Sequence, residues 1–394
     1  MSTIDPLRAP TELAERAFRE TFGATPRGVS RAPGRVNLIG GHVDYNQGLV
    51  LPAAVELEVA VAFAPRNDSR LRILSLELEQ TTDLDIGELA PGSVGGWAAY
   101  PAGVAWAFGR AGYDVRGLDA VVAGNVPIGA GLSSSAAIEV AFALAFRDAT
   151  GLDLPELELA KLGQHAENRF VGVACGIMDQ ATSACARKGS ALLLDCRSLE
   201  LRHAPLPPGL RIVVLDSGVK RELRASEYNT RRRECEEAVT RLAEVDGEIE
   251  SLRDVSPESL QSMLRHLRPP LDRRVRHVVG EIERVRLAAA ALEQDEIERF
   301  GELMFASHRS LRDDYQVSIE ELDTLVELAS AAPGVVGGRM TGAGFGGCTV
   351  VLVRAASVND FLSHVGSGYE ARYGRRPAGW VSGAADGASL RRPR

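Results

Sequence analysis

Asn125-Val-Pro-Ile-Gly-Ala-Gly-Leu-Ser-Ser-Ser-Ala-Ala137 is the stretch that decides the fold of this chain. Its two glycines, Gly129 and Gly131, let the backbone approach a bulky anion with no side chain in the way. The apolar run 136–146 that follows is predicted to form a buried helix. A glycine loop that enters a helix N-terminus binds anions, because free N–H groups and the positive end of the helix dipole face the ligand. The stretch therefore predicts a phosphate-binding loop.

Three serines, Ser133, Ser134 and Ser135, stand between the glycines and the predicted helix. Their hydroxyl groups can donate hydrogen bonds to phosphate or act as oxygen ligands for Mg²⁺. The alternative is a plain serine N-cap on a core helix. A cap needs one serine and no glycine pair, so the phosphate loop is the preferred interpretation.

The composition is that of a soluble globular protein with two domains. The chain has 394 residues, which is too long for one ordinary core, and 45% of them are hydrophobic and 25% charged. The net charge of −8 gives a nucleic-acid partner no basic surface to bind. No glycine is followed by Lys-Ser or Lys-Thr, which excludes a Walker-type phosphate loop.

The cysteines and the apolar runs predict a cytoplasmic location. The five cysteines include no CxxC pair, and an odd number of them favours reduced thiols. Residues 1–20 have no apolar segment of the signal-peptide type, and the run 136–146 is too short to span a bilayer. We therefore expect no membrane contact, and the sequence indicates no obligate protein partner.

A cluster of polar side chains follows a short strand near the N-terminus. The strand is predicted at 36–39, and the glycine turn after it carries His42, Asp44, Tyr45 and Asn46. So many polar side chains after a strand suit a ligand rich in hydroxyl groups. An exposed polar turn is the alternative.

Trp97 and Tyr100 precede a helix predicted at 102–110. Two aromatic rings near a phosphate loop can flank an adenine ring by stacking. Ordinary core aromatics are the alternative.

Two carboxylates further along the chain are candidates for partly buried positions. Glu167 lies on the border of the apolar stripe of a helix that begins near residue 156. Asp179 lies in a predicted loop, 172–180, among small and apolar residues, where an unpaired carboxylate is unfavourable. We therefore expect Asp179 to have a cationic or metal partner, and a plain surface aspartate is the alternative.

The second half of the chain begins after a turn rich in proline at 199–211, which predicts a domain boundary. Gly342-Ala-Gly-Phe-Gly-Gly347 matches GxGxxG but precedes a strand, and this order excludes a dinucleotide-binding fold. With Arg339 beside it, the loop can still close over phosphates or a sugar. Residues 245–310 are predicted to be helical and carry no recognisable chemistry. Further elements are predicted as a helix at 11–23 and strands at 50–55, 57–63, 71–76, 210–217 and 348–353.

Several segments, in this order, resemble the motifs of the GHMP small-molecule kinase superfamily, which includes galactokinase, homoserine kinase, mevalonate kinase and phosphomevalonate kinase. Within it the chain is similar to the galactokinase family, from about residue 10 to past residue 350. The matching segments are Gly34-Arg-Val-Asn-Leu-Ile-Gly with His42 and Asp44-Tyr-Asn46, Pro127-Ile-Gly-Ala-Gly-Leu-Ser-Ser-Ser-Ala-Ala, Cys175-Gly-Ile-Met-Asp-Gln, Ser226-Glu-Tyr228, Arg339-Met-Thr-Gly and Gly344-Phe-Gly-Gly-Cys.

The resemblance implies an α/β fold with two domains. Residues 1–205 would form a domain like the second domain of ribosomal protein S5, and residues 206–394 an antiparallel sheet covered by helices. The active site would lie in the cleft between them. The implied activity is that of an ATP-dependent sugar 1-kinase of galactose metabolism. ATP would be the phosphoryl donor, Mg²⁺ the metal ion and α-D-galactose the acceptor.

The resemblance also implies roles for individual residues. The loop with Gly129, Gly131 and the three serines would hold the ATP phosphates. Arg35 and Asp179 would be the catalytic pair at the acceptor hydroxyl, where Asp179 either removes the proton or orients the group. The other implied assignments are Ser135 (alternatively Ser134) and Glu167 for Mg²⁺, His42, Asp44, Gly176 and Tyr228 for the sugar, and Trp97 and Tyr100 for the adenine.

Gly41 departs from the family pattern, in which a glutamate at this place contacts O6 of the sugar. Loss of a charged acceptor should weaken recognition of that hydroxyl by about 1.5–3 kcal/mol. A related sugar kinase with a changed C6 specificity, for example toward L-arabinose, is therefore an alternative. A catalytically silent galactose sensor of the same fold is a further alternative, disfavoured by the intact run 133–137 and by the presence of Arg35 and Asp179.

Overall fold

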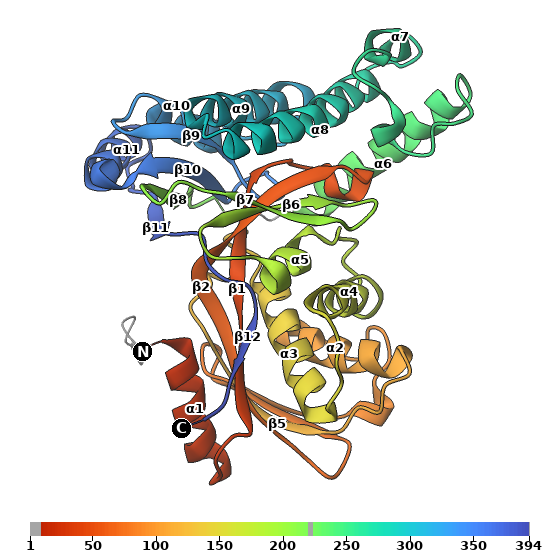
Figure 1. The fold of residues 1–394 in the computed structure, drawn as a ribbon, viewed down its shortest axis with the longest axis vertical. Coiled ribbons are helices and arrows are strands. Elements are labelled where there is room, and N and C mark those ends of the chain that lie inside the picture. Colours follow the sequence, from red (N-terminus) through yellow and green to blue (C-terminus); the bar gives the residue numbers. More distant parts are fainter. Residues whose placement is uncertain (1–8, 220–223, 394) are drawn as a thin grey trace.

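The computed structural model describes residues 9–219 and 224–393, and it shows two bodies joined at a narrow waist (Figure 1). Each body combines one sheet with helices, so the predicted α/β fold with two domains is confirmed. The boundary at 205/206 stays a prediction. The expectations about the first eight residues, and about the Ser226 side chain, lie outside the described residues.

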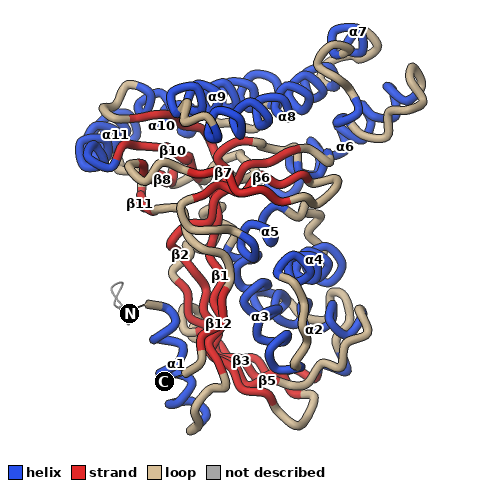
Figure 2. Tube along the Cα trace, viewed as in Figure 1, coloured by secondary structure: helices blue, strands red, loops and turns tan. Residues whose placement is uncertain are grey.

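The first body is built on an eight-stranded sheet (Figures 1 and 2). Its main order is β12-β1-β2-β5-β3-β4, with β6 paired to β2 and β7 to β6, and β3–β5 is a parallel pair in an otherwise antiparallel sheet. The strands are β1 Gly28–Ile39, β2 Leu49–Pro65, β3 Arg70–Ser75, β4 Gln80–Asp85, β5 Leu118–Gly124, β6 Ser190–Asp195, β7 Leu201–Pro205 and β12 Ser389–Arg391. The helices are α1 Pro10–Phe22, α2 Ala99–Arg110, α3 Ser134–Thr150, α4 Glu156–Ala166 and α5 Met178–Cys185.

Helix α3 is the core helix of this body. Its run 136–146 is buried as predicted, apart from the partly exposed Ile138, and it packs against β1 and β2. The small side chains allow a close approach to the sheet, where Ser30 Oγ on β1 donates to the Ala141 carbonyl at 2.7 Å. Because α3 begins directly after the glycine–serine loop, this packing fixes the position of the loop.

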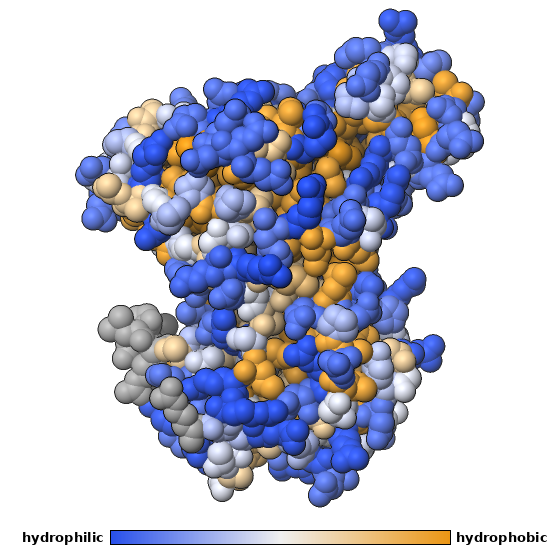
Figure 3. Space-filling model, viewed as in Figure 1, coloured by the Kyte–Doolittle hydropathy of each residue, from blue (hydrophilic) through white to orange (hydrophobic). Residues whose placement is uncertain are grey.

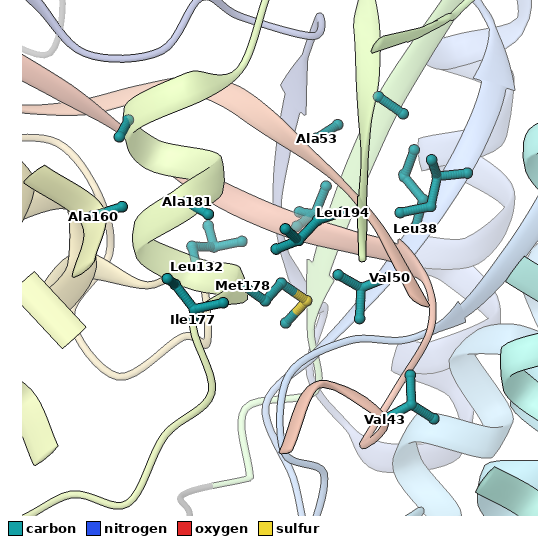
Figure 4. Close-up of a cluster of buried hydrophobic side chains, with 14 of the residues drawn as sticks. Leu38, Val43, Val50, Ala53, Leu132, Ala160, Ile177, Met178, Ala181 and Leu194 are labelled. Atoms are coloured by element: carbon teal, nitrogen blue, oxygen red, sulfur yellow. The ribbon is translucent and has the colours of Figure 1, made fainter. Parts of the chain in front are cut away.

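Strand β2 replaces the two strands predicted at 50–55 and 57–63. The chain stays extended through Glu56, which is exposed and whose N–H donates to Ser382 Oγ. The register of the β1–β2 pairing shifts between Pro33 and Arg35 and again between Asn37 and Ile39. One irregular long strand therefore runs through the waist, where its apolar residues belong to the cluster in Figure 4 that also contains Met178 of α5 and Leu194 of β6.

The second body has a four-stranded antiparallel sheet in the order β11-β8-β10-β9, with long helices packed on it (Figure 1). The predicted strands at 210–217 and 348–353 are confirmed. The region 245–310, predicted to be helical, forms helices from Leu260 onward, whereas residues 245–259 contain one short 3-10 turn, Leu252–Asp254. The strands are β8 Leu210–Asp216, β9 Val335–Met340, β10 Cys348–Arg354 and β11 Ala378–Ser382, and the helices are α6 Arg224–Ala243, α7 Leu260–Leu264, α8 Leu271–Glu293, α9 Ile297–Ser310, α10 Glu320–Ser330 and α11 Val358–Tyr373.

The last strand returns to the first body. β12 pairs with β1, and Arg391 forms an ion pair with Glu15 of α1 at 2.7 Å, so the C-terminal segment lies beside α1 (Figure 1). Hydrophilic residues cover most of the face in Figure 3, and apolar residues show at the waist and in patches on both bodies. Among the described residues, none of the helices has the length and apolar character needed to cross a bilayer.

Candidate active site

A cavity of about 760 Å³ contains in its wall every residue that the sequence assigned to ATP, metal or sugar. Most of its wall comes from the first body, whereas Tyr228 of α6 and Ala343 of the glycine-rich loop after β9 come from the second. The structure thus brings all fourteen residues together, and their individual roles stay predictions. They are Arg35, His42, Asp44, Trp97, Tyr100, Gly129, Gly131, Ser133, Ser134, Ser135, Glu167, Gly176, Asp179 and Tyr228.

The loop before α3 has the backbone that a phosphate loop requires. Gly129 and Gly131 have φ angles of 80° and 84°, in the left-handed region that favours glycine. Helix α3 begins at Ser134, and the first N–H groups of a helix have no partner within it. These groups and the helix dipole face the same end of the cavity wall, which suits an anionic ligand.

Ser133 is not a plain N-cap of α3. It has a left-handed φ of 57°, and its side chain makes no capping hydrogen bond. Its hydroxyl donates to Asp179 Oδ2 at 2.6 Å instead. A non-glycine residue in this conformation costs energy that the surroundings must offset, and such residues cluster at functional sites.

Arg35 and Asp179 form a bidentate ion pair in the cavity wall. Arg35 Nε donates to Oδ1 at 2.7 Å and Nη2 to Oδ2 at 2.6 Å, while Nη1 donates to the Gly131 carbonyl at 2.7 Å. The Arg35 side chain is 5% exposed and the Asp179 side chain 25%, so the carboxylate keeps a face toward the cavity. The cationic partner expected for Asp179 is therefore present, and the guanidinium links it to the phosphate loop.

Asp179 was predicted in a loop, and this was wrong. It lies in the first turn of α5, where the positive end of the helix dipole stabilises a carboxylate. The sequence 172–180 misled because its glycines and small residues do not show the apolar spacing of a helix. Met178 and Ala181 of α5 pack in the cluster of Figure 4, and this packing holds the turn in place.

Glu167 belongs to a buried group of carboxylates. It lies in a π-helical turn, Glu167–Val171, after α4, and Gln180 Nε2 donates to it at 2.6 Å and to Glu139 at 2.9 Å. Burial raises the pKa of both carboxyl groups, and that of Glu139 lies well above its usual range. The Ser135 side chain lies close enough to Glu167 to oppose part of the rise in its pKa. No cationic side chain among the described residues pairs with either carboxyl group.

The sugar motif places Asp44 against Gly176. A Cβ on residue 176 would overlap the Asp44 carboxylate, so only glycine allows this approach. Burial, and after it the charge of Asp179, raises the pKa of Asp44 to about 6. The Tyr228 ring lies 5.6 Å from the His42 ring and 5.3 Å from the Tyr45 ring, so it covers the motif from the second body.

Both ring nitrogens of His42 are bonded within the protein. Nε2 lies 3.1 Å from the Ala343 carbonyl, which only accepts, so Nε2 carries the proton. Burial lowers the His42 pKa to about 3, so the ring is neutral and Nδ1 accepts from Tyr45 Oη at 2.9 Å. Tyr45 Oη in turn accepts from Tyr315 Oη at 2.7 Å. The imidazole therefore fastens the sugar motif to the second body.

The two predicted adenine-side aromatics lie in different surroundings. Trp97 Nε1 donates to Gln80 Oε1 at 2.9 Å, at the edge of the cavity near β4. Burial, and then the charges of Glu167 and Glu139, raises the pKa of Tyr100 to about 12. Tyr100 therefore lies beside the carboxylate group, whereas Trp97 stands away from it.

The structure adds residues that the sequence did not single out. The sequence contains a signal for Glu139, because it is the one carboxylate in the apolar run 136–146 and is therefore expected to be buried. The sequence contains no such signal for Glu281 of α8, because its pairing with Arg284 resembles an ordinary i, i+3 surface pair. Yet Glu281 is buried and accepts the N–H groups of Gly40 and Gly41 at 2.9 and 3.0 Å. The region 245–310, in which no chemistry was recognised, thus holds the sugar motif.

Three family models match the chain. They are the galactokinase galactose-binding signature at residues 16–65, the GHMP kinases N terminal domain at 99–187 and the GHMP kinases C terminal model at 288–371. A crystal structure of mevalonate kinase, with a TM-score of 0.64 and 18% identity, covers 93% of this chain and 99% of its own and shares the fold. The fold and the site thus define a phosphotransferase of the GHMP kinase class.

Closer relatives identify the family. A galactokinase from Chloroflexus aurantiacus is 48% identical over 374 residues, which cover 95% of this chain and 96% of the relative. The human galactokinase is 45% identical over 386 residues, with 96% and 95% coverage. A Lactococcus lactis galactokinase, solved in complex with galactose, has a TM-score of 0.91 and 35% identity over 95% of this chain and 98% of its own. The chain belongs to the galactokinase family.

Proposed function

We propose that this protein transfers the γ-phosphoryl group of ATP to the anomeric hydroxyl of galactose and releases galactose 1-phosphate and ADP. The observation that carries the proposal is the placement of Asp179. Its carboxylate is bonded to Arg35 and Ser133. Ser133 belongs to the loop that suits the phosphates, and Arg35 binds the Gly131 carbonyl of the same loop. One rigid unit thus holds the acceptor-side carboxylate and the phosphate side of the cavity together.

Positioning is the main task in this chemistry. Phosphoryl transfer passes through a loose transition state, so the protein aligns the reactants and neutralises charge. The Gly131 carbonyl and both oxygens of Asp179 are bonded to Arg35, and these bonds would keep the guanidinium next to the transferred phosphoryl group, where charge develops. Asp179 would either accept the proton of the acceptor hydroxyl or orient that hydroxyl.

Mg²⁺ fits the residues beside the loop. Ser135 and Glu167 would supply the oxygen ligands that this ion prefers, and the buried carboxyl groups lack a cationic partner among the described residues. No group of three or more His, Cys, Asp or Glu side chains in the described chain is arranged for a metal. Phosphate oxygens and water would therefore complete the ligand set, as is usual for Mg²⁺. Bound there, the ion would neutralise charge on the phosphates.

The acceptor is tested by an assay that measures ADP release. Galactose, 2-deoxygalactose, galactosamine, L-arabinose and mevalonate are compared at matched concentrations with ATP and Mg²⁺. We expect galactose to be phosphorylated and mevalonate to be inert. Failure of every sugar would overturn the proposal and favour the silent sensor.

A changed C6 specificity is a second candidate, and residue 41 is the observation that favours it. The cavity wall at Gly41 offers no side chain to a substituent at C6. If no other group recognises O6, L-arabinose should compete better than in enzymes with a glutamate at this place. A ratio of kcat/KM for the two sugars equal to that of such an enzyme would exclude this candidate.

A further inference from the structure

The turn that carries the sugar motif is held from the second body as well as by Asn37 and Asn46 of its own segment, whose side-chain amides donate to the carbonyls of Gly40 and His42. Glu281 Oε1 accepts the N–H groups of Gly40 and Gly41, and His277 Nε2 lies 2.9 Å from the Gly41 carbonyl. Both side chains are fully buried on α8. The three main-chain contacts fix the peptide groups directly before His42 and Asp44.

Arg339 completes this anchor. Its side chain, on β9, is 0% exposed, and Nη1 lies 3.3 Å from Glu281 Oε1. No described residue accepts a hydrogen bond from Nη2, which stands where a Cβ on residue 41 would be. A second guanidinium, that of Arg284, donates to Glu281 Oε2 at 2.7 Å. Burial opposes ionisation of Glu281, but these two cations outweigh it and hold its pKa far below the usual range.

We propose that Glu281 and Arg339 are positioning residues of the sugar-binding turn, and that in this chain the Arg339 guanidinium fills the space beside Gly41 that a side chain at residue 41 would need. The inference rests on the proposed function only in naming the sugar as the ligand of this turn. A side chain at residue 41 would push the guanidinium away from Glu281 and loosen the two N–H contacts. The loss should then appear at the sugar and not at the nucleotide, which binds on the loop before α3.

A double-mutant cycle tests the fit between the two positions. Gly41→Ala, Arg339→Lys and the double variant are compared with the wild type for the KM of galactose, the KM of ATP, kcat and the melting temperature. Lysine keeps the charge beside Glu281 but lacks the second nitrogen of the fork. We expect Gly41→Ala to raise the galactose KM about tenfold, as overpacking of a close contact does, with the ATP KM unchanged within about twofold. In the Arg339→Lys background, Gly41→Ala should raise the galactose KM by less than about threefold.

Matched controls separate this contact from general effects of substitution. Gly109 of α2 has open space where a Cβ would stand, so Gly109→Ala should change none of the four quantities. Arg286 of α8 forms an exposed pair with Glu283, so Arg286→Lys should also be silent. If Gly41→Ala does not fold, Glu281→Asp replaces it, because a shorter carboxylate withdraws from the two N–H groups. It should raise the galactose KM selectively as well.

Two results would overturn the proposal. One is strict additivity of the two substitutions in both the galactose KM and the melting temperature. The other is an equal rise of the galactose and ATP KM values in Gly41→Ala or Glu281→Asp. If the wild type releases no ADP with any sugar, the proposed function fails instead, and the cycle is then decided by the melting temperature alone, since the contact between residues 41 and 339 exists without a ligand.

Discussion

Replacing Asp179 by asparagine tests the centre of the proposed mechanism. The change keeps the shape of the side chain but removes its charge and turns one acceptor oxygen into a donor. Asp179 accepts three hydrogen bonds, two from Arg35 at 2.7 and 2.6 Å and one from Ser133 at 2.6 Å. At least one of these contacts is therefore lost in the variant, and the buried guanidinium loses its counter-ion.

The expected magnitude follows from both effects. Loss of a positioned proton acceptor typically lowers a rate by about 10²–10⁴-fold. Misplacement of Arg35, which also bonds to the Gly131 carbonyl, would disturb the phosphate side as well. We expect kcat to fall at least about 10²-fold, equivalent to about 2.7 kcal/mol of transition-state stabilisation. The KM for ATP should change far less, because the main-chain amides of the loop remain.

The assay is steady-state release of ADP at saturating galactose and ATP, with thermal melting as the measure of folding. Asp148→Asn is the matched control, because Asp148 is likewise ion-paired with arginine, in its case with Arg27 and Arg392, but lies outside the cavity wall. It should keep a kcat near that of the wild type. A folded Asp179→Asn protein with unreduced kcat would refute the reasoning.

Three further predictions follow from the cavity wall. Burial raises the pKa of Asp44 to about 6. If its carboxylate accepts sugar hydroxyls as proposed, kcat/KM for galactose should fall as the pH drops below 6 and the group becomes protonated, and a pH profile of Asp44→Asn should lack this limb. Glu167→Gln should raise the Mg²⁺ concentration for half-maximal activity at least about tenfold, measured by Mg²⁺ titration at fixed ATP, and an unchanged midpoint would count against a ligand role. Gly176→Ala should raise the galactose KM about tenfold in the same kinetic assay, because its Cβ would overlap the Asp44 carboxylate, whereas an unchanged KM would show that the turn can give way.

The phosphate side of the site could be predicted from the sequence because its chemistry is local. Gly129 and Gly131 need left-handed φ angles, and three serines before an apolar run have few other uses. The partner of Asp179 could be predicted as a cation from the apolar surroundings alone. Its identity as Arg35 came from a resemblance, since 144 residues separate the two side chains.

The secondary structure failed where local signals were ambiguous. Glu56 looked like a break between two strands. The strand continues through this exposed glutamate because its N–H group bonds to Ser382 from the C-terminal segment. Small residues around Asp179 looked like a loop, but tertiary packing of Met178 and Ala181 makes them the first turns of α5. In both cases a contact distant in sequence overrode the local preference.

The sugar side shows why sequence patterns alone miss positioning residues. Glu281 and Arg284 have the spacing and charges of a pair on a solvated helix face. Only the fold shows that Glu281 is buried and that it bonds to the amide of Gly40, 241 residues away in the sequence. His42 is the opposite case. Its polar neighbours in the sequence indicate a ligand-binding residue, yet both ring nitrogens bond to protein groups. The sugar motif therefore depends on several contacts from the second body, among them those of Glu281 and of the Ala343 carbonyl. The loop that begins α3 also contacts the second body, because Cys348 Sγ of β10 donates to the Ala130 carbonyl at 2.8 Å. A change in the arrangement of the two bodies would therefore alter both the sugar motif and this loop.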